Sequence, residues 1–272
     1  MTDHHLAPQQ LSADQSEQDL WENLKQFTKA RIALGRAGAS LPTKAWLDFQ
    51  AAHAQAKDAV WASLDEAALL TALQTRQLPI VQVHSQNVDK ADYLKRPDLG
   101  RCLSVASRTS LLQWQQQDCA EPIDVVVVIA DGLSATAVQQ HAIPMLDTLL
   151  QACKAQHWYV GPIVLAQGAR VALGDEIAQI LNAKMLVVMI GERPGLSSPD
   201  SMGIYYTWKA QVGTQDAARN CISNIHAAGC SVEDASRILI GLMRASERLQ
   251  QSGIALKDQS DPTAARYLKH AE

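Results

Sequence analysis

The sequence predicts an α/β protein in which a doubly wound, mostly parallel sheet follows an N-terminal helical extension. Short apolar runs recur after residue 79, and the strongest, "DVVVVIA" (Asp124–Ala130), is rich in β-branched residues. Unbroken runs of this kind are typical of strands that are buried on both faces. Amphipathic helical patterns alternate with these runs, as expected for parallel strands joined by crossover helices. Before residue 79 the apolar residues recur at the helical spacings of three and four.

The predicted domain organisation has four parts. Residues 1–18 are polar and acidic and predict a flexible tail, and residues 19–78 form an N-terminal helical region. Residues 79–253 form the α/β domain, and residues 254–272 form a C-terminal tail. A chain of 272 residues can bury one sizeable core, which this organisation places in the α/β domain.

Three helices are predicted in the N-terminal region, where apolar residues form stripes. They run from Trp21 to about Arg36, from about Thr43 to Leu64 and from Asp65 to Thr75. Glycines and a proline in "GRAGASLP" separate the first helix from the second. The bulky stripes allow two interpretations, a cover for the α/β core or a surface that binds a partner protein.

The elements of the α/β domain follow from the same patterns, taken in order along the chain. Strands are predicted at "PIVQVHS", "DVVVVIA", "WYVGPIVLA" and "MLVVMIG", and "GIYYTWK" fits an antiparallel strand. Five helices are predicted between and after these strands. The first ends near Gln116, and the second runs from an N-cap at Ser134 to about Cys153. The others cover Arg170–Leu181, Asp216–Ala228 and Val232–Gln251, and Ser231 is the N-cap of the last. This alternation makes the sheet Rossmann-like.

Composition and charge exclude several classes of protein. The formal net charge of −4 and the dispersed basic residues argue against a broad surface for nucleic acid or for an anionic membrane. The longest apolar runs fall far short of the ~18–20 residues that a membrane span needs, and the N-terminus lacks the features of a secretory signal. Five scattered cysteines without a C-x-x-C pair favour free thiols in a reducing compartment, and argue against disulfides or structural zinc.

Three predicted strands end in similar loops, "IADGLS", "LAQGAR" and "IGERPG". Because ligands of open parallel sheets bind outside the carboxyl ends of the strands, these loops would line one rim. Each loop has a glycine that permits close backbone approach and polar groups just past the apolar run. Two interpretations stay open for Glu192 in the third loop, a plain turn residue or a carboxylate that faces a ligand pocket.

The common catalytic and nucleotide-binding signatures are absent from the sequence. There is no Walker loop, no G-x-G-x-x-G after a strand, no H-E-x-x-H and no G-x-S-x-G. "NIHAAG" has the outline of a D-x-H-x-x-G cobalamin box, but Asn224 replaces the aspartate that would orient His226. A satisfied histidine is therefore the preferred interpretation of His226. Cys221 is interpreted either as a small buried hydrophobe or as a residue that lines a pocket.

Seven ordered motifs carry a resemblance to a known family. They are "ARIALGRAG", "DFQAAHAQAKDAV", "RPDLGR", "DVVVVIADGLSA", "GARVALGDEI", "IGERPG" and "ARNCISNIHAAG". In this order the motifs resemble the small (light) subunit of ethanolamine ammonia-lyase. The resemblance covers the chain from about Trp21 to Gln251, with small departures at Lys57 and Cys102.

The resemblance implies a function that the chain performs only with a partner. In this family a larger TIM-barrel subunit holds ethanolamine and most of the chemistry, and the complex converts ethanolamine to acetaldehyde and ammonia with adenosylcobalamin. The cofactor lies between the two subunits, so residues 79–253 would be a cobalamin-binding domain. Carried over to this chain, the small-subunit contacts to cobalamin are Val171, Glu192 and Cys221. The assembly would be a large hetero-oligomer of trimerised pairs.

The chemistry of these residue types agrees with such a cofactor. A corrin is a broad apolar disc with amide side chains on its rim, so Val171 can pack on the disc and Glu192 can accept an amide N–H. We expect no catalytic residue and no metal ligand in this chain, and no binding of nucleic acid or membrane. The expected location is the cytoplasm, with the hypothesis that the N-terminal tail addresses the complex to a bacterial microcompartment. The rival hypotheses are an α/β adaptor without a cofactor and an independent α/β enzyme.

Overall fold

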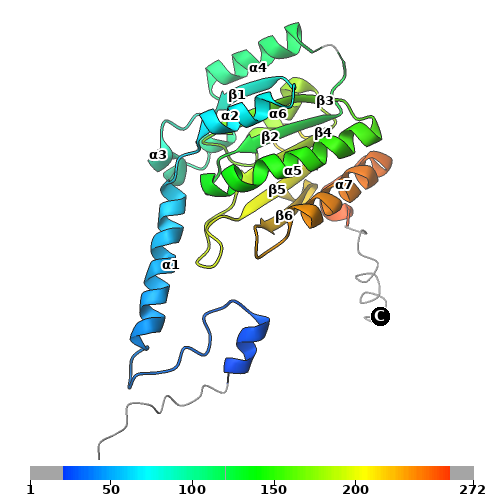
Figure 1. The fold of residues 1–272 in the computed structure, drawn as a ribbon. Coiled ribbons are helices and arrows are strands. Elements are labelled where there is room, and N and C mark those ends of the chain that lie inside the picture. Colours follow the sequence, from blue (N-terminus) through cyan, green and yellow to red (C-terminus); the bar gives the residue numbers. More distant parts are fainter. Residues whose placement is uncertain (1–20, 120, 258–272) are drawn as a thin grey trace, which may run out of the picture. The chain divides into compact units, whose positions relative to one another are not determined.

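A computed structural model describes residues 21–119 and 121–257 of the chain (Figure 1). The chain divides into two compact units, with the boundary between Ala54 and Gln55. The tail predicted at residues 1–18 lies outside the described residues, as does the C-terminal tail from residue 258 onward. Among the described residues, no helix is long and apolar enough to cross a membrane.

The N-terminal unit contains less helix than the sequence predicts. A 3-10 helix, η1 (Glu22–Phe27), replaces the predicted helix from Trp21 to Arg36. The chain beyond η1 cannot be helical because Ala33 and Gly35 have φ angles of 52° and 74°. No residue between 21 and 54 is buried, so no packing compensates for the low stability of a short helix. The next two predicted helices are confirmed as α1 (Thr43–Trp61), which crosses the boundary, and α2 (Glu66–Gln74).

The second unit is built on a six-stranded, mostly parallel sheet. Its strands are β1 (Ile80–His84), β2 (Val125–Ala130), β3 (Val160–Gln167), β4 (Met185–Gly191), β5 (Met202–Trp208) and β6 (Arg219–Ile225). The strand order is β1-β3-β2-β4-β5-β6. The first four strands in this order pair in parallel, whereas β5 is antiparallel to both β4 and β6. The antiparallel strand predicted at "GIYYTWK" is therefore confirmed.

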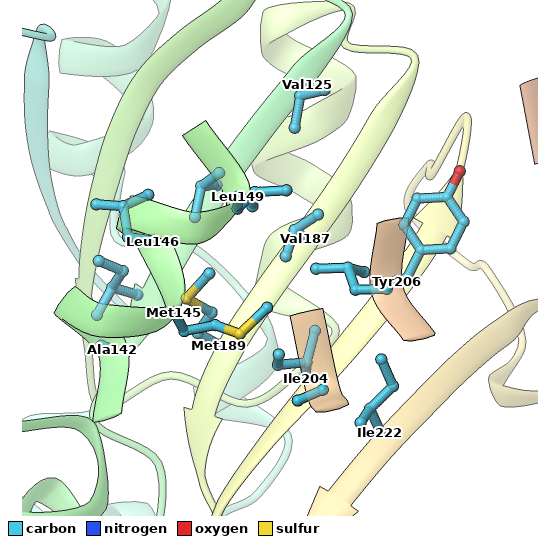
Figure 2. Close-up of a cluster of buried hydrophobic side chains, with 14 of the residues drawn as sticks. Val125, Ala142, Met145, Leu146, Leu149, Val187, Met189, Ile204, Tyr206 and Ile222 are labelled. Atoms are coloured by element: carbon cyan, nitrogen blue, oxygen red, sulfur yellow. The ribbon is translucent and has the colours of Figure 1, made fainter. Parts of the chain in front are cut away.

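Helices cover both faces of the parallel strands. The remaining helices are α3 (Lys90–Lys95), η2 (Leu99–Arg101), α4 (Val105–Gln117), α5 (Ala135–Gln156), α6 (Leu173–Leu181), η3 (Asp216–Ala218), α7 (Val232–Leu249) and η4 (Gly253–Ala255). On one face α2, α5 and α7 share a core with alternate strand residues such as Val187 and Ile204 (Figure 2). On the other face α4 and α6 pack against the intervening residues, such as Val126 and Val188. Ser134 and Ser231 cap α5 and α7 as predicted.

The helix predicted at Asp216–Ala228 is wrong, because this segment forms η3 and then strand β6. Ile222 and Ile225 lie three residues apart, a helical spacing, yet both belong to the core on the α5 and α7 face. A register shift makes this possible, since Ile222 pairs with Ile204 while Ile225 pairs with Met202. The extra residue of this β-bulge turns both isoleucines to one face.

The ordered part of the α/β domain also extends further than residue 253. Leu256 is buried in the core on the α5 and α7 face. The Asn220 side chain donates hydrogen bonds to the carbonyl oxygens of Gly253 and Leu256, at 3.1 and 2.9 Å. The boundary predicted after residue 253 therefore falls short of the last core residue.

Candidate functional site

The three predicted strand-end loops are neighbours at one edge of the sheet. They follow β2, β3 and β4, which pair in parallel, so their carboxyl ends meet at the same edge. The Leu133 N–H donates to the Gly191 carbonyl at 2.9 Å, and Gly132 lies so close to Gly191 that a Cβ atom there would meet its carbonyl oxygen. The predicted rim is therefore confirmed as a geometric feature, with glycines where the loops touch.

Asp131 ties two of these loops together. Its carboxylate accepts backbone N–H bonds from Gly132, Gly168 and Ala169, at 2.8, 3.1 and 3.2 Å. Burial raises the pKa of Asp131, and the positive charge of Lys90 opposes this shift. The carboxylate thus takes up the backbone donors that a ligand anion would otherwise use at this point between β2 and β3. A hollow of about 290 Å³ remains beside the carboxylate, lined by Lys90, Asp131 and Gly168 among others.

The open face of the sheet lies elsewhere, over the antiparallel strands. Gly203 and Tyr205 of β5, with Cys221 and Ser223 of β6, face away from the core shared with α5 and α7, and we call these four residues the β5–β6 surface. Cys221 and Ser223 are exposed and Tyr205 is half-buried. Helices α4 and α6 pack mainly against the parallel strands, so this surface has no comparable helical cover among the described residues.

Glu192 borders the β5–β6 surface directly after β4. Its Oε2 atom accepts hydrogen bonds from the Ser201 hydroxyl at 2.6 Å and from the Asn224 backbone N–H at 3.1 Å. Its Oε1 atom lies over Gly203, where an added Cβ would come within 2.8 Å. The carboxylate is thus held through Oε2, while Oε1 accepts no hydrogen bond from the described part of the chain.

Val171 borders the same region from the turn that precedes α6. It is half-buried and lines a hollow of about 570 Å³ together with Tyr205. Tyr205 in turn pairs with Cys221 across β5 and β6. Tyr205 therefore adjoins both the hollow that Val171 lines and Cys221, although Val171 and Cys221 are 50 positions apart in the sequence.

Cys221 is an exposed strand residue, so the interpretation as a buried hydrophobe is wrong. Desolvation by its neighbours raises the pKa of the Cys221 thiol, Tyr205 opposes this shift by a hydrogen bond, and the negative charge of Glu192 adds to it. Burial raises the pKa of Tyr205 to about 12, with further contributions from Cys221 and Glu192. Glu192, Tyr205 and Cys221 therefore lie close enough for the charge of Glu192 to influence the pKa of both other groups. All five cysteines are free thiols, as predicted.

His226 follows β6 in a loop rather than in a helix. It is buried, its Nε2 atom lies 2.9 Å from Asn224 Oδ1, and its Nδ1 atom accepts the Ala228 N–H at 3.3 Å. Both ring nitrogens therefore have protein partners, which confirms the satisfied histidine. Across residues 21–119 and 121–257, no group of three or more His, Cys, Asp or Glu side chains could hold a metal ion.

Sequence reasoning missed three residues that shape this region. The sequence pattern indicates only a turn at Asp131 and only a strand at Gly203 and Tyr205. A usable signal was present for the last two, since alternate residues of an antiparallel strand face opposite sides. The partner strand was interpreted as a helix, so the surface they form with Cys221 could not be foreseen.

Comparison with known proteins identifies relatives along most of the chain. The sequence model of the family described as "Ethanolamine ammonia-lyase light chain (EutC)" matches residues 18–257. The chain is 52% identical to the ethanolamine ammonia-lyase small subunit of Pseudomonas fluorescens (strain Pf0-1), over 89% of this chain and 88% of that protein. It is 48% identical to the small subunit of Pseudomonas aeruginosa (strain LESB58), over 97% and 94%. The small subunit of Azotobacter vinelandii is 50% identical, over 89% of each chain.

Proposed function

The chain belongs to the ethanolamine ammonia-lyase light-chain family, and on this premise we propose that it is the small subunit of an adenosylcobalamin-dependent ethanolamine ammonia-lyase. With a large subunit, it would convert ethanolamine to acetaldehyde and ammonia. The large subunit would bind ethanolamine, and this chain would supply part of the cobalamin site at the interface between the two.

The observation that supports this proposal is the convergence of Val171, Glu192 and Cys221 around the β5–β6 surface. Within residues 21–119 and 121–257 no helix covers this surface to the extent that α4 and α6 cover the parallel strands, and its border combines apolar, aromatic and hydrogen-bonding groups. A corrin needs the same combination, a broad apolar seat with a few polar contacts for its amide side chains. The residues present therefore fit the cofactor. A surface open on one side also agrees with a site that a second subunit completes.

Each residue has a definite role in this proposal. Glu192, whose Oε2 is already bound, offers Oε1 as an acceptor for a corrin amide N–H. Val171 and Tyr205 provide apolar contact area, and Cys221 supplies a small side chain where the corrin approaches β6. When bound, adenosylcobalamin supplies homolysis of its cobalt–carbon bond, which starts hydrogen abstraction from the substrate. This chain orients the cofactor and excludes water, and we assign it no proton transfer.

We also propose the wider architecture that goes with this function. The α/β domain would be doubly wound and Rossmann-like, since α5 and α6 leave neighbouring strands for opposite faces of the sheet. The complex would be a hetero-oligomer of trimerised pairs in the cytoplasm. The N-terminal tail would direct some of it to a bacterial microcompartment.

Replacing Glu192 by glutamine in the two-subunit complex tests the proposal. The glutamine carbonyl can still accept from Ser201 and Asn224, while its NH₂ group replaces the acceptor offered to the corrin. We expect an intact fold and a loss of about 1–2 kcal/mol in cobalamin binding, roughly 5- to 30-fold in Kd, measured by spectral titration. Glu121→Gln, at another exposed carboxylate, is the matched control and should leave Kd unchanged.

Two outcomes would favour the rival functions. If the wild-type pair neither retains cobalamin on gel filtration nor changes its absorption spectrum, the chain is an adaptor without a cofactor. If the isolated chain turned over ethanolamine, the assignment of the chemistry to the large subunit would be wrong. If the Glu192→Gln complex binds cobalamin with wild-type affinity, Glu192 does not contact the cofactor and is only a turn residue.

A further inference from the structure

A buried ion pair joins helix α6 to strand β6. Arg219 donates two hydrogen bonds to Asp175, from Nη1 to Oδ1 at 2.6 Å and from Nη2 to Oδ2 at 2.7 Å. The side chains are only 3% and 2% exposed. Arg219 Nη2 also donates to the Thr214 carbonyl at 2.8 Å, and Nε to Asp216 at 3.3 Å. The guanidinium is thus held on several sides.

The two partners of this fork each lie next to a residue of the proposed cofactor site. Asp175 lies in the first turn of α6, four residues after Val171. Arg219 precedes Cys221 by two residues and therefore points to the same face of β6. Asp175, Arg219 and Val171 line the same hollow. The fork therefore connects α6, which follows Val171, to the strand that carries Cys221.

Stability alone is a poor reason for this fork. Removing two charges from water is costly, and well-packed apolar residues often replace a buried ion pair without loss of stability. A two-pronged arginine–carboxylate contact instead fixes distance and orientation, which an apolar contact between the same elements cannot do. Burial raises the pKa of Asp175 and the Arg219 guanidinium opposes that shift, so the two groups depend on each other.

We propose that Arg219 and Asp175 are a positioning pair that sets the spacing between Val171 and Cys221 for cofactor binding. The inference rests on the function proposed above. Neither residue contacts the cofactor in this scheme. They hold α6 and β6 at a fixed separation, so that Val171 and the β5–β6 surface contact the corrin at the same time. Lysine at position 219 would keep the charge but lose the two-pronged geometry.

The deciding experiment replaces both partners at once in the complex with the large subunit. The Asp175→Leu, Arg219→Met double variant removes the charges but keeps the volume, so we expect its thermal midpoint to stay close to wild type. Its Kd for cobalamin should rise about 10- to 100-fold, the range typical of residues that orient the ligands of a bound metal. Arg219→Lys is the milder variant and should show a smaller rise with full folding.

The chain offers a matched control on the opposite face of the sheet. Arg76, in the turn after α2, also makes a two-pronged contact with Asp147 of α5, from Nε and Nη2 at 2.7 and 2.6 Å, in a more exposed setting. The Asp147→Leu, Arg76→Met double variant should leave cobalamin affinity unchanged. Hydrogen exchange provides a readout without cofactor, and only the Asp175/Arg219 variant should exchange faster at residues 170–176 and 219–223.

The outcomes separate this inference from the proposed function. If the wild-type complex binds cobalamin and the Asp175/Arg219 double variant binds it with the same Kd, the positioning role is overturned, whereas the proposed function stands. An equal rise in Kd in both double variants would also overturn it, because the effect would then be general. If the wild-type complex binds no cobalamin, the proposed function fails, and the cofactor-positioning role fails with it. Faster exchange together with a selective rise in Kd supports the proposal.

Discussion

The parallel strands β1–β4 and the antiparallel strands β5 and β6 belong to one sheet, but they differ in how they are covered. The parallel part carries helices on both faces, and every residue of β2 and β4 is buried. Among the described residues, the antiparallel part has a comparable helical cover on one face only, and only every third residue of β6 is buried. One half of the sheet is therefore built for stability. The antiparallel part leaves one face less covered, and there we propose that the cofactor binds.

The largest expected effect comes from a cavity in the core beside the parallel strands, which helices cover on both faces. Leu146 of α5 is fully buried against the sheet (Figure 2), so Leu146→Ala leaves a cavity. We expect a loss of about 2–5 kcal/mol in the free energy of unfolding, measured by chemical denaturation. The exposed Leu112→Ala is the control and should change stability little. A small effect of Leu146→Ala would contradict the view that this half holds the fold together.

A smaller effect is expected at Gly203, where the two halves meet. An alanine Cβ there would press on the movable Glu192 carboxylate, with Oε1 2.8 Å away, rather than on fixed backbone. We expect the free energy of unfolding to fall by less than about 1 kcal/mol, while cobalamin affinity falls as in Glu192→Gln. Spectral titration measures the affinity, and the Gly203→Ala, Glu192→Gln double variant should show no further loss. Additive losses would mean that Gly203 acts independently of Glu192.

The smallest expected effect concerns the electrostatics of the β5–β6 surface without any cofactor. Desolvation and then the charge of Glu192 raise the pKa of the Cys221 thiol. Glu192→Gln should lower this pKa, so more thiolate is present at a given pH and alkylation is faster. The rate is followed at Cys221 by mass spectrometry across a pH series, with the half-buried Cys102 as internal control. An unchanged pH profile of the alkylation rate would show that the charge of Glu192 does not influence the pKa of Cys221.

Sequence reasoning succeeded where local pattern and tertiary structure agree. The run "DVVVVIA" is a strand because four consecutive valines favour β-structure and only a position between two layers accepts them. Similarly, Ser134 and Ser231 cap their helices through local hydrogen bonds. The three strand-end loops were also found, because the alternation of strands and helices brings their ends to one edge.

Sequence reasoning failed where distant contacts decide the local structure. A β-bulge gave Ile222 and Ile225 a helical spacing, so β6 was predicted as a helix. The stripe after Trp21 predicts a helix through Arg36, but none of the residues from Phe27 to Arg36 is buried, and the φ angles of Ala33 and Gly35 are not helical. As a result the neighbourhood of Cys221, and the role of Tyr205 beside it, were not predicted.

The sequence by itself determined the buried strands and the helix caps, because each depends on residues close together in the chain. It also determined the rim of glycine-containing loops, because alternating strands and helices bring strand ends to one edge, and the family, because its motifs follow one another in order along the chain. It also singled out Glu192 as a carboxylate at the end of a buried strand. Only the tertiary structure decided that Glu192 lies over Gly203, that Tyr205 pairs with Cys221, and that Arg219 reaches Asp175. These contacts depend on strand register and on which face of the sheet is left uncovered. Both are settled by packing between distant segments.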